Sequence, residues 1–457
     1  MPEQKVMNRW LVVVGGILIQ LCLGAIYAWS VFTKKITIPI DDGGLYGFTA
    51  KQAAWVFSAG LASFALVMVL VGPWAKQKPR MAAALGGIVL GIGYILGGFL
   101  GNSFAAQFIC IGLIGGAGIG IAYVVPIAVG IKWFPDKKGM IAGLGVAGFG
   151  FGATLWVKLA GSWFGGLLNT TSIFGLPGVQ SVFVIYGAAF LIIVLIGSIY
   201  MVDPPKGYKP TGWEPPAPTD AGATGTLDMT SRQMLGTPQY YMLLAMFTGS
   251  ALAGLMVIYC IRLFGIDALQ ASGVTTDAES AGVIAGTAMA WYAILNGLGR
   301  IIWGTVSDKI GRKCALFLMC LFQGIIMLAF LKMGGSKAGL IVGACIIGFN
   351  FGGNFALFPT ATADFFGTKN LGPNYGWVFL AYGVAGIAGP QVAGYFKDAA
   401  KTSGAGVAAW NTPFVIAAVA CIAAAVIALL LKPVKVSAVA VETSTPDPSL
   451  TAEVKPE

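Results

Sequence analysis

Twelve long apolar segments constrain the fold of this 457-residue chain more than any other sequence feature. A helix needs about 20 mostly apolar residues to cross a hydrocarbon core of ~30 Å, and in lipid its backbone groups must bond internally. Charged residues make up 10% of the sequence, against about 25% in soluble domains. The sequence therefore predicts an all-α membrane protein. The predicted spans are 11–33, 53–74, 81–101, 104–131, 139–163, 180–201, 238–264, 280–304, 314–332, 339–363, 373–396 and 411–431.

The basic residues of the loops predict how these spans are oriented. With the N-terminus inside, the inner segments contain 18 Lys and Arg residues and the outer loops contain 8. Because positive residues concentrate on the cytoplasmic side of membrane proteins, both termini are expected to be cytoplasmic. Topology thus accounts for most of the net charge of +10, and no nucleic-acid partner is predicted.

The sequence also lacks the residues that most enzymes and metal proteins use. It has no histidine, which is the commonest general base and metal ligand. Its seven cysteines lie inside apolar segments, and none forms a CxxC pair. The sequence contains no catalytic triad, metal cluster or phosphate-binding loop. We therefore expect a protein that is not an enzyme, with no catalytic residue, no metal and no cofactor.

The two halves of the chain are related by an internal repeat with an offset of 232 residues. The loop after the second span corresponds to the loop after the eighth, and Lys76 stands where the later loop has Asp308. In the same way, Lys132 after the fourth span corresponds to Asp364 after the tenth. Two parallel repeats of six helices are the architecture of a major facilitator transporter, which holds its substrate near the membrane midplane between the halves.

The segment between the two repeats is rich in Pro, Gly and Thr, which is typical of a flexible linker. The end of the chain is rich in Ser, Thr, Pro and Glu and is predicted to be disordered. The predicted organisation is a six-helix half at 1–202, a cytoplasmic linker at 203–232, a pseudo-symmetric six-helix half at 233–432 and a cytoplasmic tail at 433–457.

The loop after the eighth span resembles the signature loop of the major facilitator superfamily. It reads Gly304-x-x-x-Asp308-Lys-x-Gly311-Arg312. Gly304 permits close helix packing, Asp308 can accept hydrogen bonds from a helix N-terminus, and Arg312 can pair with acidic groups. We predict that these four residues form a conformational gate. The alternative is an ordinary positively charged inside loop.

One arginine is predicted to lie near the membrane midplane. Arg300 stands eight residues before Asp308, which is about 12 Å along a helix, whereas half of the hydrocarbon core is about 15 Å. An arginine there costs at least ~2.5 kcal/mol, and no carboxylate occupies the middle of any predicted span. Arg300 is therefore predicted to bind an anion. The alternatives are bonds to helix carbonyls or a side chain that extends toward the inner face.

Polar and aromatic residues of several spans are expected to surround Arg300. Asn296 and Tyr292 share its helix face at spacings of four residues. The predicted substrate-binding residues are Arg300, Asn296, Tyr27, Tyr123, Phe355 and Tyr382. Each aromatic residue has the alternative of a lipid-facing or core position. Lys158, near the outer end of the fifth span, is predicted to extend to the membrane surface, with a second anion-binding charge as the alternative.

Several motifs resemble the oxalate/formate antiporter family of the major facilitator superfamily, which includes bacterial monocarboxylate carriers. They are Tyr27-Ala-Trp-Ser30, Lys132-Trp-Phe-Pro-Asp-Lys-Lys-Gly139, Asn296-x-x-Gly299-Arg300, Phe358-Pro-Thr-Ala-Thr-Ala-Asp-Phe-Phe-Gly-Thr-Lys-Asn-Leu-Gly372 and Asn374-Tyr-Gly376. The resemblance implies that Arg300 binds the substrate carboxylate and that Tyr27 and Tyr123 line the pore. It also implies a multi-pass location in a bacterial or archaeal cytoplasmic membrane. Where the family's oxalate exchanger has a second cation, on the eleventh helix, this sequence has Tyr382, which favours a monoanion.

The predicted function is secondary active transport of small organic anions, foremost short monocarboxylates such as lactate, pyruvate, formate or acetate. Transport would occur by alternating access, either as proton-linked symport or as anion exchange. The alternatives are a dicarboxylate exchanger of the oxalate/formate type and a carboxylate sensor that transports nothing. The expected partners are the substrate, a proton or counter-anion and the lipid bilayer, and we expect a monomer.

Overall fold

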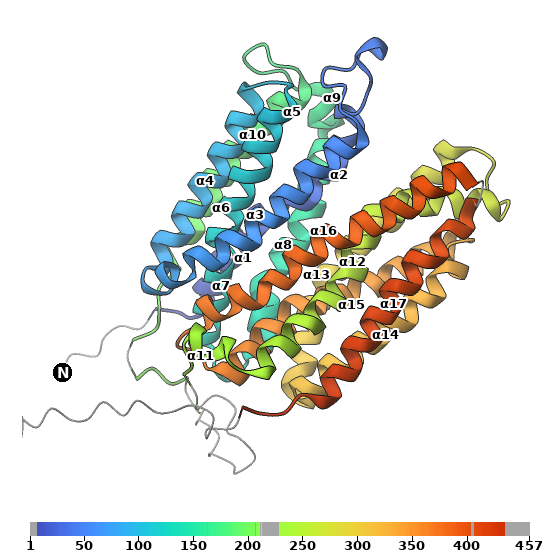
Figure 1. The fold of residues 1–457 in the computed structure, drawn as a ribbon. Helices are drawn as coiled ribbons and strands as arrows, with labels where there is room; N and C mark the ends of the chain where they lie inside the picture. The colour runs from blue at the N-terminus through green and yellow to red at the C-terminus, as the bar shows by residue number, and fades with distance from the viewer. Residues whose placement is uncertain are drawn as a thin grey trace, which may run out of the picture.

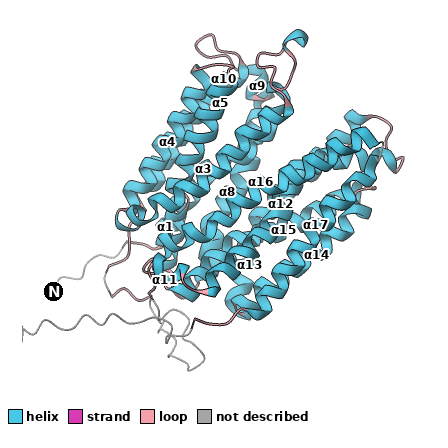
Figure 2. Cartoon of the chain, viewed as in Figure 1, coloured by secondary structure: helices cyan, strands magenta, loops and turns pink. Residues whose placement is uncertain are grey.

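The computed structural model describes residues 7–161, 163–205, 207–210, 212, 228–403 and 406–434. Helices and their connecting loops make up all of these residues (Figure 2). Twelve helices are long and apolar enough to cross a membrane, which confirms the predicted number of spans. Most of the predicted linker, at 213–227, and the tail from residue 435 lie outside the described residues.

The first six spans are built from helices that are not all continuous α-helix. In the first span, the 3₁₀ segment η1 follows α1 and leads into α2, and in the fourth span the π-helical η3 precedes α6 and α7. Such irregular turns are frequent at hinges and functional sites, and the apolar periodicity did not predict them. The bounds are α1 (Trp10–Leu23), η1 (Gly24–Ala28), α2 (Trp29–Ile36), η2 (Ile40–Asp42), α3 (Ala50–Gln77), α4 (Pro79–Phe99), α5 (Phe104–Gln107), η3 (Phe108–Gly115), α6 (Gly116–Ala122), α7 (Val124–Trp133), α8 (Lys138–Gly161), η4 (Trp163–Gly165), α9 (Leu167–Thr170) and α10 (Gly178–Ser198).

The last six spans are longer and more regular. Their starts carry local signals: Thr237 caps α12 with its hydroxyl oxygen, Pro238 occupies the first turn of that helix, and Ser336 caps α15. The bounds are α11 (Ser231–Leu235), α12 (Pro238–Ala271), α13 (Ala278–Ile310), α14 (Arg312–Met333), α15 (Lys337–Phe366), α16 (Leu371–Ser403), η5 (Gly406–Trp410) and α17 (Asn411–Leu430).

The helices from α1 to α10 form one group, and those from α12 to α17 form another (Figure 1). The two groups lie close together at the end of the molecule that carries α11, called the α11 end here, and diverge toward the opposite α9 end. Two pairs of helices make the main contacts between the groups, α8 with α13 and α3 with α16. These pairs are related by the sequence repeat, because each joins the second membrane span of one half to the fifth membrane span of the other half.

Glycines allow α8 and α13 to approach closely. A Cβ atom at Gly143 would collide with the backbone carbonyl of Arg300, and one at Gly139 would collide with the carbonyl of Gly304. Small residues at such positions are typical of membrane helix pairs, whose stability comes from packing. This seam brings the backbone of α8 next to the part of α13 that carries Arg300.

Candidate functional site

The structure places Arg300 on α13 at the boundary between the two helix groups, with no exposed surface. Its Nε donates to Asn296 Oδ1 at 3.0 Å, and its Nη1 donates to the carbonyl oxygen of Val146 on α8 at 2.8 Å. The guanidinium carbon lies 4.1 Å from the ring centre of Phe355 and 5.3 Å from that of Phe149. Arg300 therefore contacts one aromatic ring from each group of helices, and such cation–π contacts stabilise its charge.

These contacts leave the guanidinium only partly satisfied. Its Nη2 is buried and has no hydrogen-bond partner among the described residues. None of the ion pairs of the described residues involves Arg300. A buried charge without a counter-charge is destabilising, so the site favours binding of an anion that can accept from Nη2.

Four tyrosines gather near Arg300. Three of them, Tyr27, Tyr123 and Tyr382, are the predicted substrate-binding tyrosines, and the fourth is Tyr375. The hydroxyl groups of Tyr27 and Tyr382 hydrogen-bond to each other and thereby connect η1 to α16 across the two groups. The hydroxyl groups of Tyr123 and Tyr375 are buried, and each lacks a partner among the described residues. Tyr27 and Tyr123 pack against Phe149, and Tyr382 packs against Phe355, the two rings that lie against the guanidinium. Phenolic hydroxyls can donate hydrogen bonds, so this cluster contains donors that an anion could use.

Four phenylalanines that we did not predict complete the walls of the site. Phe149 packs edge-on to Tyr27 and Tyr123, and Phe379 lies between Tyr123 and Tyr382. Phe64 contacts Tyr123 and Phe247 contacts Phe355. Phe379 could have been found, since it lies four residues after Tyr375 and three before Tyr382 on one helix face. No sequence pattern distinguishes Phe149, Phe64 and Phe247 from the many phenylalanines of this apolar sequence that face lipid or the core.

Other polar residues of these spans make hydrogen bonds that serve helix packing. The hydroxyl of Tyr292 donates to the carbonyl oxygen of Gly254, and Asn350 Oδ1 accepts from Trp303 Nε1. Gln20 donates to the backbone carbonyl of Tyr123. Lys158 lies in the last turn of α8 and is half-buried. It is 12 residues after Val146, the residue of α8 that contacts Arg300.

The predicted gate residues contact the other helix group at the α11 end. Asp308 accepts from the backbone N–H groups of Gly139 and Met140 at 3.0 and 2.9 Å, at the N-terminus of α8. Arg312 Nη2 pairs with Asp308 at 2.7 Å, and its Nε pairs with Asp364 at 2.8 Å. These contacts hold a carboxylate where the helix dipole of α8 favours one.

Asp308, Arg312, Asp364 and Lys138 together are called the gate cluster here. Lys138, the first residue of α8, pairs with Asp364 at 3.1 Å and so connects the two groups a second time. Gly311 joins α13 to α14 with a φ of 84°, a conformation that favours glycine. The α11 end is thus closed by charged contacts between the groups.

The comparisons with known proteins agree with this architecture. The sequence matches the family model described as Major Facilitator Superfamily over residues 10–390 and 274–455. A solved structure of the proton:xylose symporter XylE has a similar fold, with a TM-score of 0.64 and 12% sequence identity over 93% of this chain and 96% of its own. At that identity the likeness concerns the fold alone.

Three curated relatives cover most of the chain. The uncharacterized MFS-type transporter YhjX of Escherichia coli is 28% identical over 84% of this chain and 88% of its own length. The oxalate:formate antiporter of Oxalobacter formigenes is 27% identical, with coverages of 90% and 88%. The apicoplast pyruvate carrier 1 of Toxoplasma gondii is 25% identical, with coverages of 81% and 81%. The predicted resemblance to oxalate/formate-type carriers is confirmed by the second of these.

Proposed function

The chain belongs to the major facilitator superfamily, a family of multi-pass membrane transporters, and from that premise we propose that it carries small organic monoanions by alternating access. The observation that carries this proposal is the buried guanidinium of Arg300, which has one unsatisfied nitrogen and no carboxylate partner among the described residues.

The chemistry of the site favours a carboxylate as the anion. A planar guanidinium binds a planar carboxylate with well-matched geometry, and it stays protonated at any physiological pH. Tyr123 and Tyr375 offer hydroxyl donors for the second carboxylate oxygen. The phenylalanine rings would accept a short apolar substituent. Relatives named for oxalate, formate and pyruvate support the same substrate class.

The charge of the site favours a monoanion over a dianion. Arg300 is the one cation among the buried residues of the site, and Tyr382 occupies the α16 position where the resemblance to the oxalate exchanger implies a second cation. The preferred substrates would be lactate, pyruvate, formate or acetate. A dicarboxylate exchanger that adds Lys158 is the second candidate, and similarity to the oxalate:formate antiporter favours it.

The proposed cycle uses contacts on both sides of Arg300. Separation of Tyr27 from Tyr382 would open the site toward the α9 end, and rupture of the gate cluster would open it toward the α11 end. A bound substrate anion would neutralise Arg300 and so lower the free-energy cost of a state that is closed on both sides. This favours exchange of anions or entry of the anion together with a proton. We propose that the α11 end faces the cytoplasm, as the loop charges predict.

The test is uptake of labelled lactate, pyruvate, formate, acetate and oxalate into proteoliposomes with imposed pH and voltage gradients. We expect Arg300→Gln to reduce uptake of every substrate at least ~100-fold, because loss of one partner of a buried charged pair costs several kcal/mol. Lys158→Gln is the control and should retain monocarboxylate uptake. Undiminished uptake in Arg300→Gln would refute the proposal, and oxalate uptake that requires Lys158 would select the dicarboxylate candidate.

A further inference from the structure

A small cavity lies between the two helix groups at the α11 end, away from Arg300. It has a volume of about 20 Å³ and is lined by the end of α3, by α7, by Asp203 and by the residues where α16 begins. Its charged lining residues are Lys76, Lys132, Lys369 and Asp203. Three cations and one acid give this lining a formal charge of +2.

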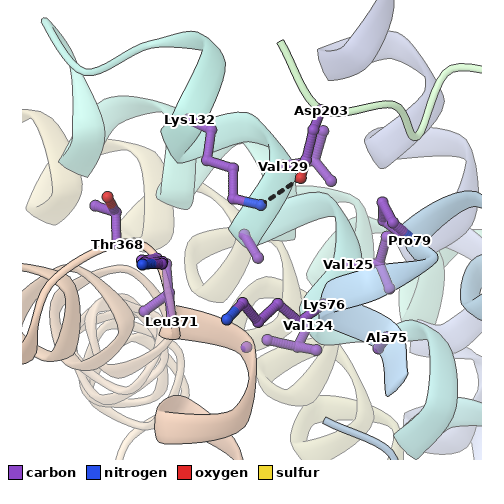
Figure 3. A pocket seen from close by; sticks show the side chains of 13 residues that line it. Ala75, Lys76, Pro79, Val124, Val125, Val129, Lys132, Asp203, Thr368 and Leu371 are labelled. Carbon is purple, nitrogen blue, oxygen red and sulfur yellow. Dashed lines mark hydrogen bonds and ion pairs between the residues drawn. The ribbon is translucent and has the colours of Figure 1, made fainter. Parts of the chain in front are cut away.

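The contacts of the lining residues leave Lys76 without a counter-charge. Lys132 Nζ pairs with Asp203 Oδ2 at 2.6 Å, which neutralises that lysine (Figure 3). Lys76 Nζ donates to the neutral side chain of Asn370, whose Oδ1 accepts at 2.6 Å. Its ammonium points toward the start of α16, where Leu371 lies (Figure 3). None of the ion pairs among the described residues involves Lys76.

The repeat identifies what this cavity lacks. The offset of 232 residues relates Lys76 to Asp308, and it relates Leu371 and Gly372 to Gly139 and Met140. In the gate cluster the Asp308 carboxylate accepts from both of those backbone N–H groups. On the repeat-related side, a lysine faces the N-terminus of α16 instead. A cation is unfavourable there, because the helix dipole already places positive charge at that end.

A second carboxylate of the gate cluster is also replaced by a lysine in the first repeat. Lys132 stands where the gate cluster has Asp364, and the neutral Asn370 stands where it has Lys138. Both carboxylates of the gate cluster are therefore replaced by lysines in the first repeat. The gate cluster has two acids and two bases and is neutral, whereas its counterpart carries surplus positive charge.

We propose that a small anion binds in this cavity and takes the place of the missing carboxylate. It would accept from Lys76 Nζ and from the backbone N–H of Gly372, since the N–H of Leu371 already donates to the carbonyl oxygen of Thr368 at 3.3 Å. It would thereby join α3 to α16 when the α11 end is closed. The volume accommodates a body of about the size of one water molecule, such as a halide ion or a single oxygen of a phosphate or carboxylate. Bound there, the anion favours the state that is closed at the α11 end.

Binding at this site can be separated from binding at Arg300 by working in an Arg300→Gln background. The detergent-solubilised variant is melted, with its 12 tryptophans as the fluorescent probe, in gluconate, chloride or phosphate at equal ionic strength. We expect chloride or phosphate to raise the Tm by roughly 1–3 °C over gluconate. A further arm adds phosphatidylglycerol in gluconate, because a lipid headgroup offers the same phosphate oxygen.

Replacement variants identify the residue responsible. Lys76→Asp in the same background restores the carboxylate of the other repeat, so its Tm should no longer respond to any of the anions. Lys76→Gln should also lose the response. The matched control is Lys78→Asp, an equal charge change at an exposed position outside the cavity lining, which should keep it.

The variants distinguish an anion site at Lys76 from general charge screening. A response to phosphatidylglycerol alone, abolished by Lys76→Asp, supports the site and assigns the anion to a lipid headgroup. Equal responses in Lys76→Asp and Lys78→Asp would overturn the proposal in favour of general charge screening, and so would the absence of any response in the Arg300→Gln background. Neither result depends on whether the protein transports a carboxylate.

Discussion

Asn296 orients the guanidinium of Arg300 without neutralising it. Its amide oxygen accepts from Nε at 3.0 Å, one helical turn before the arginine. An amide carries no net charge, so the positive charge of Arg300 stays available to an anion. A carboxylate at the same position would make an intrahelical ion pair in a buried place and would compete with the substrate.

Substitution of Asn296 by Asp is predicted to make anion uptake depend on pH. Above the pKa of the new carboxyl group, the ion pair with Arg300 should reduce uptake at least ~10-fold. As the pH falls through that pKa the acid becomes neutral, and uptake should recover. The measurement is initial uptake in proteoliposomes from pH 5 to pH 8, with equal pH on both sides.

The control for this substitution is Asn296→Leu, which removes the acceptor without adding a charge. Its uptake should follow the pH profile of the wild-type protein. If Asn296→Asp also follows that profile at undiminished rate, then a carboxylate at this position does not affect the charge that we propose binds substrate.

At the scale of helices, the seam between α8 and α13 positions the site. Gly143 lies against the backbone of Arg300, and the carbonyl of Val146, one turn later on α8, accepts from its guanidinium. The distance between the two helices therefore determines whether Arg300 reaches α8. A side chain in the seam would separate the helices, whereas one on another face of α8 would not.

Gly143→Ala is predicted to impair both packing and uptake. The added Cβ would collide with the carbonyl of Arg300, and overpacking of this kind costs about 1–3 kcal/mol. We expect a lower Tm and at least ~10-fold slower uptake. Gly145→Ala is the matched control, because its nearest neighbour would be an oxygen atom of Pro126 at 4.0 Å. A Gly143→Ala variant as active and stable as Gly145→Ala would show that close contact of α8 with α13 is dispensable.

For the whole molecule, the charged contacts at the α11 end stabilise one arrangement of the two helix groups. The Asp308 carboxylate accepts two N–H bonds from α8, and Lys138 pairs with Asp364 across the same boundary. Hydrogen bonds to charged groups contribute about 1.5–3 kcal/mol each, and ~1.4 kcal/mol changes an equilibrium tenfold. Loss of the carboxylate should therefore shift the balance between closed and open states measurably.

Asp308→Asn is predicted to increase the population that is open at the α11 end by more than ~10-fold. Spin labels on cysteines introduced at Lys78 and Lys313, both exposed and on opposite helix groups, would report the change as longer label-to-label distances. The labelled background carries Cys314→Ser, which removes an exposed native thiol. Asp228→Asn, which changes a carboxylate outside the gate cluster, is the control. Unchanged distances in Asp308→Asn would mean that the gate cluster does not hold this end closed.

The sequence by itself determined the twelve spans, and it predicts the depth of Arg300. Both depend on short-range properties: the number of apolar residues in a row and the rise of a helix from Asp308. The sequence repeat alone also relates Asp308 to Lys76. The predicted roles of the site residues and the division at 203–232 remain predictions.

The tertiary structure alone decided which groups meet across the two halves. It brought the Val146 carbonyl and the Phe149 ring to Arg300, joined Tyr27 to Tyr382, and turned Lys76 toward the start of α16. These contacts depend on how each helix is rotated and how closely it approaches its partner, which glycine packing sets over long separations in sequence. In a chain where nearly every position of a span is apolar, hydrophobic periodicity carries little information about rotation. The sequence could therefore place Arg300 within a predicted span, but only the packed helices could decide what surrounds it.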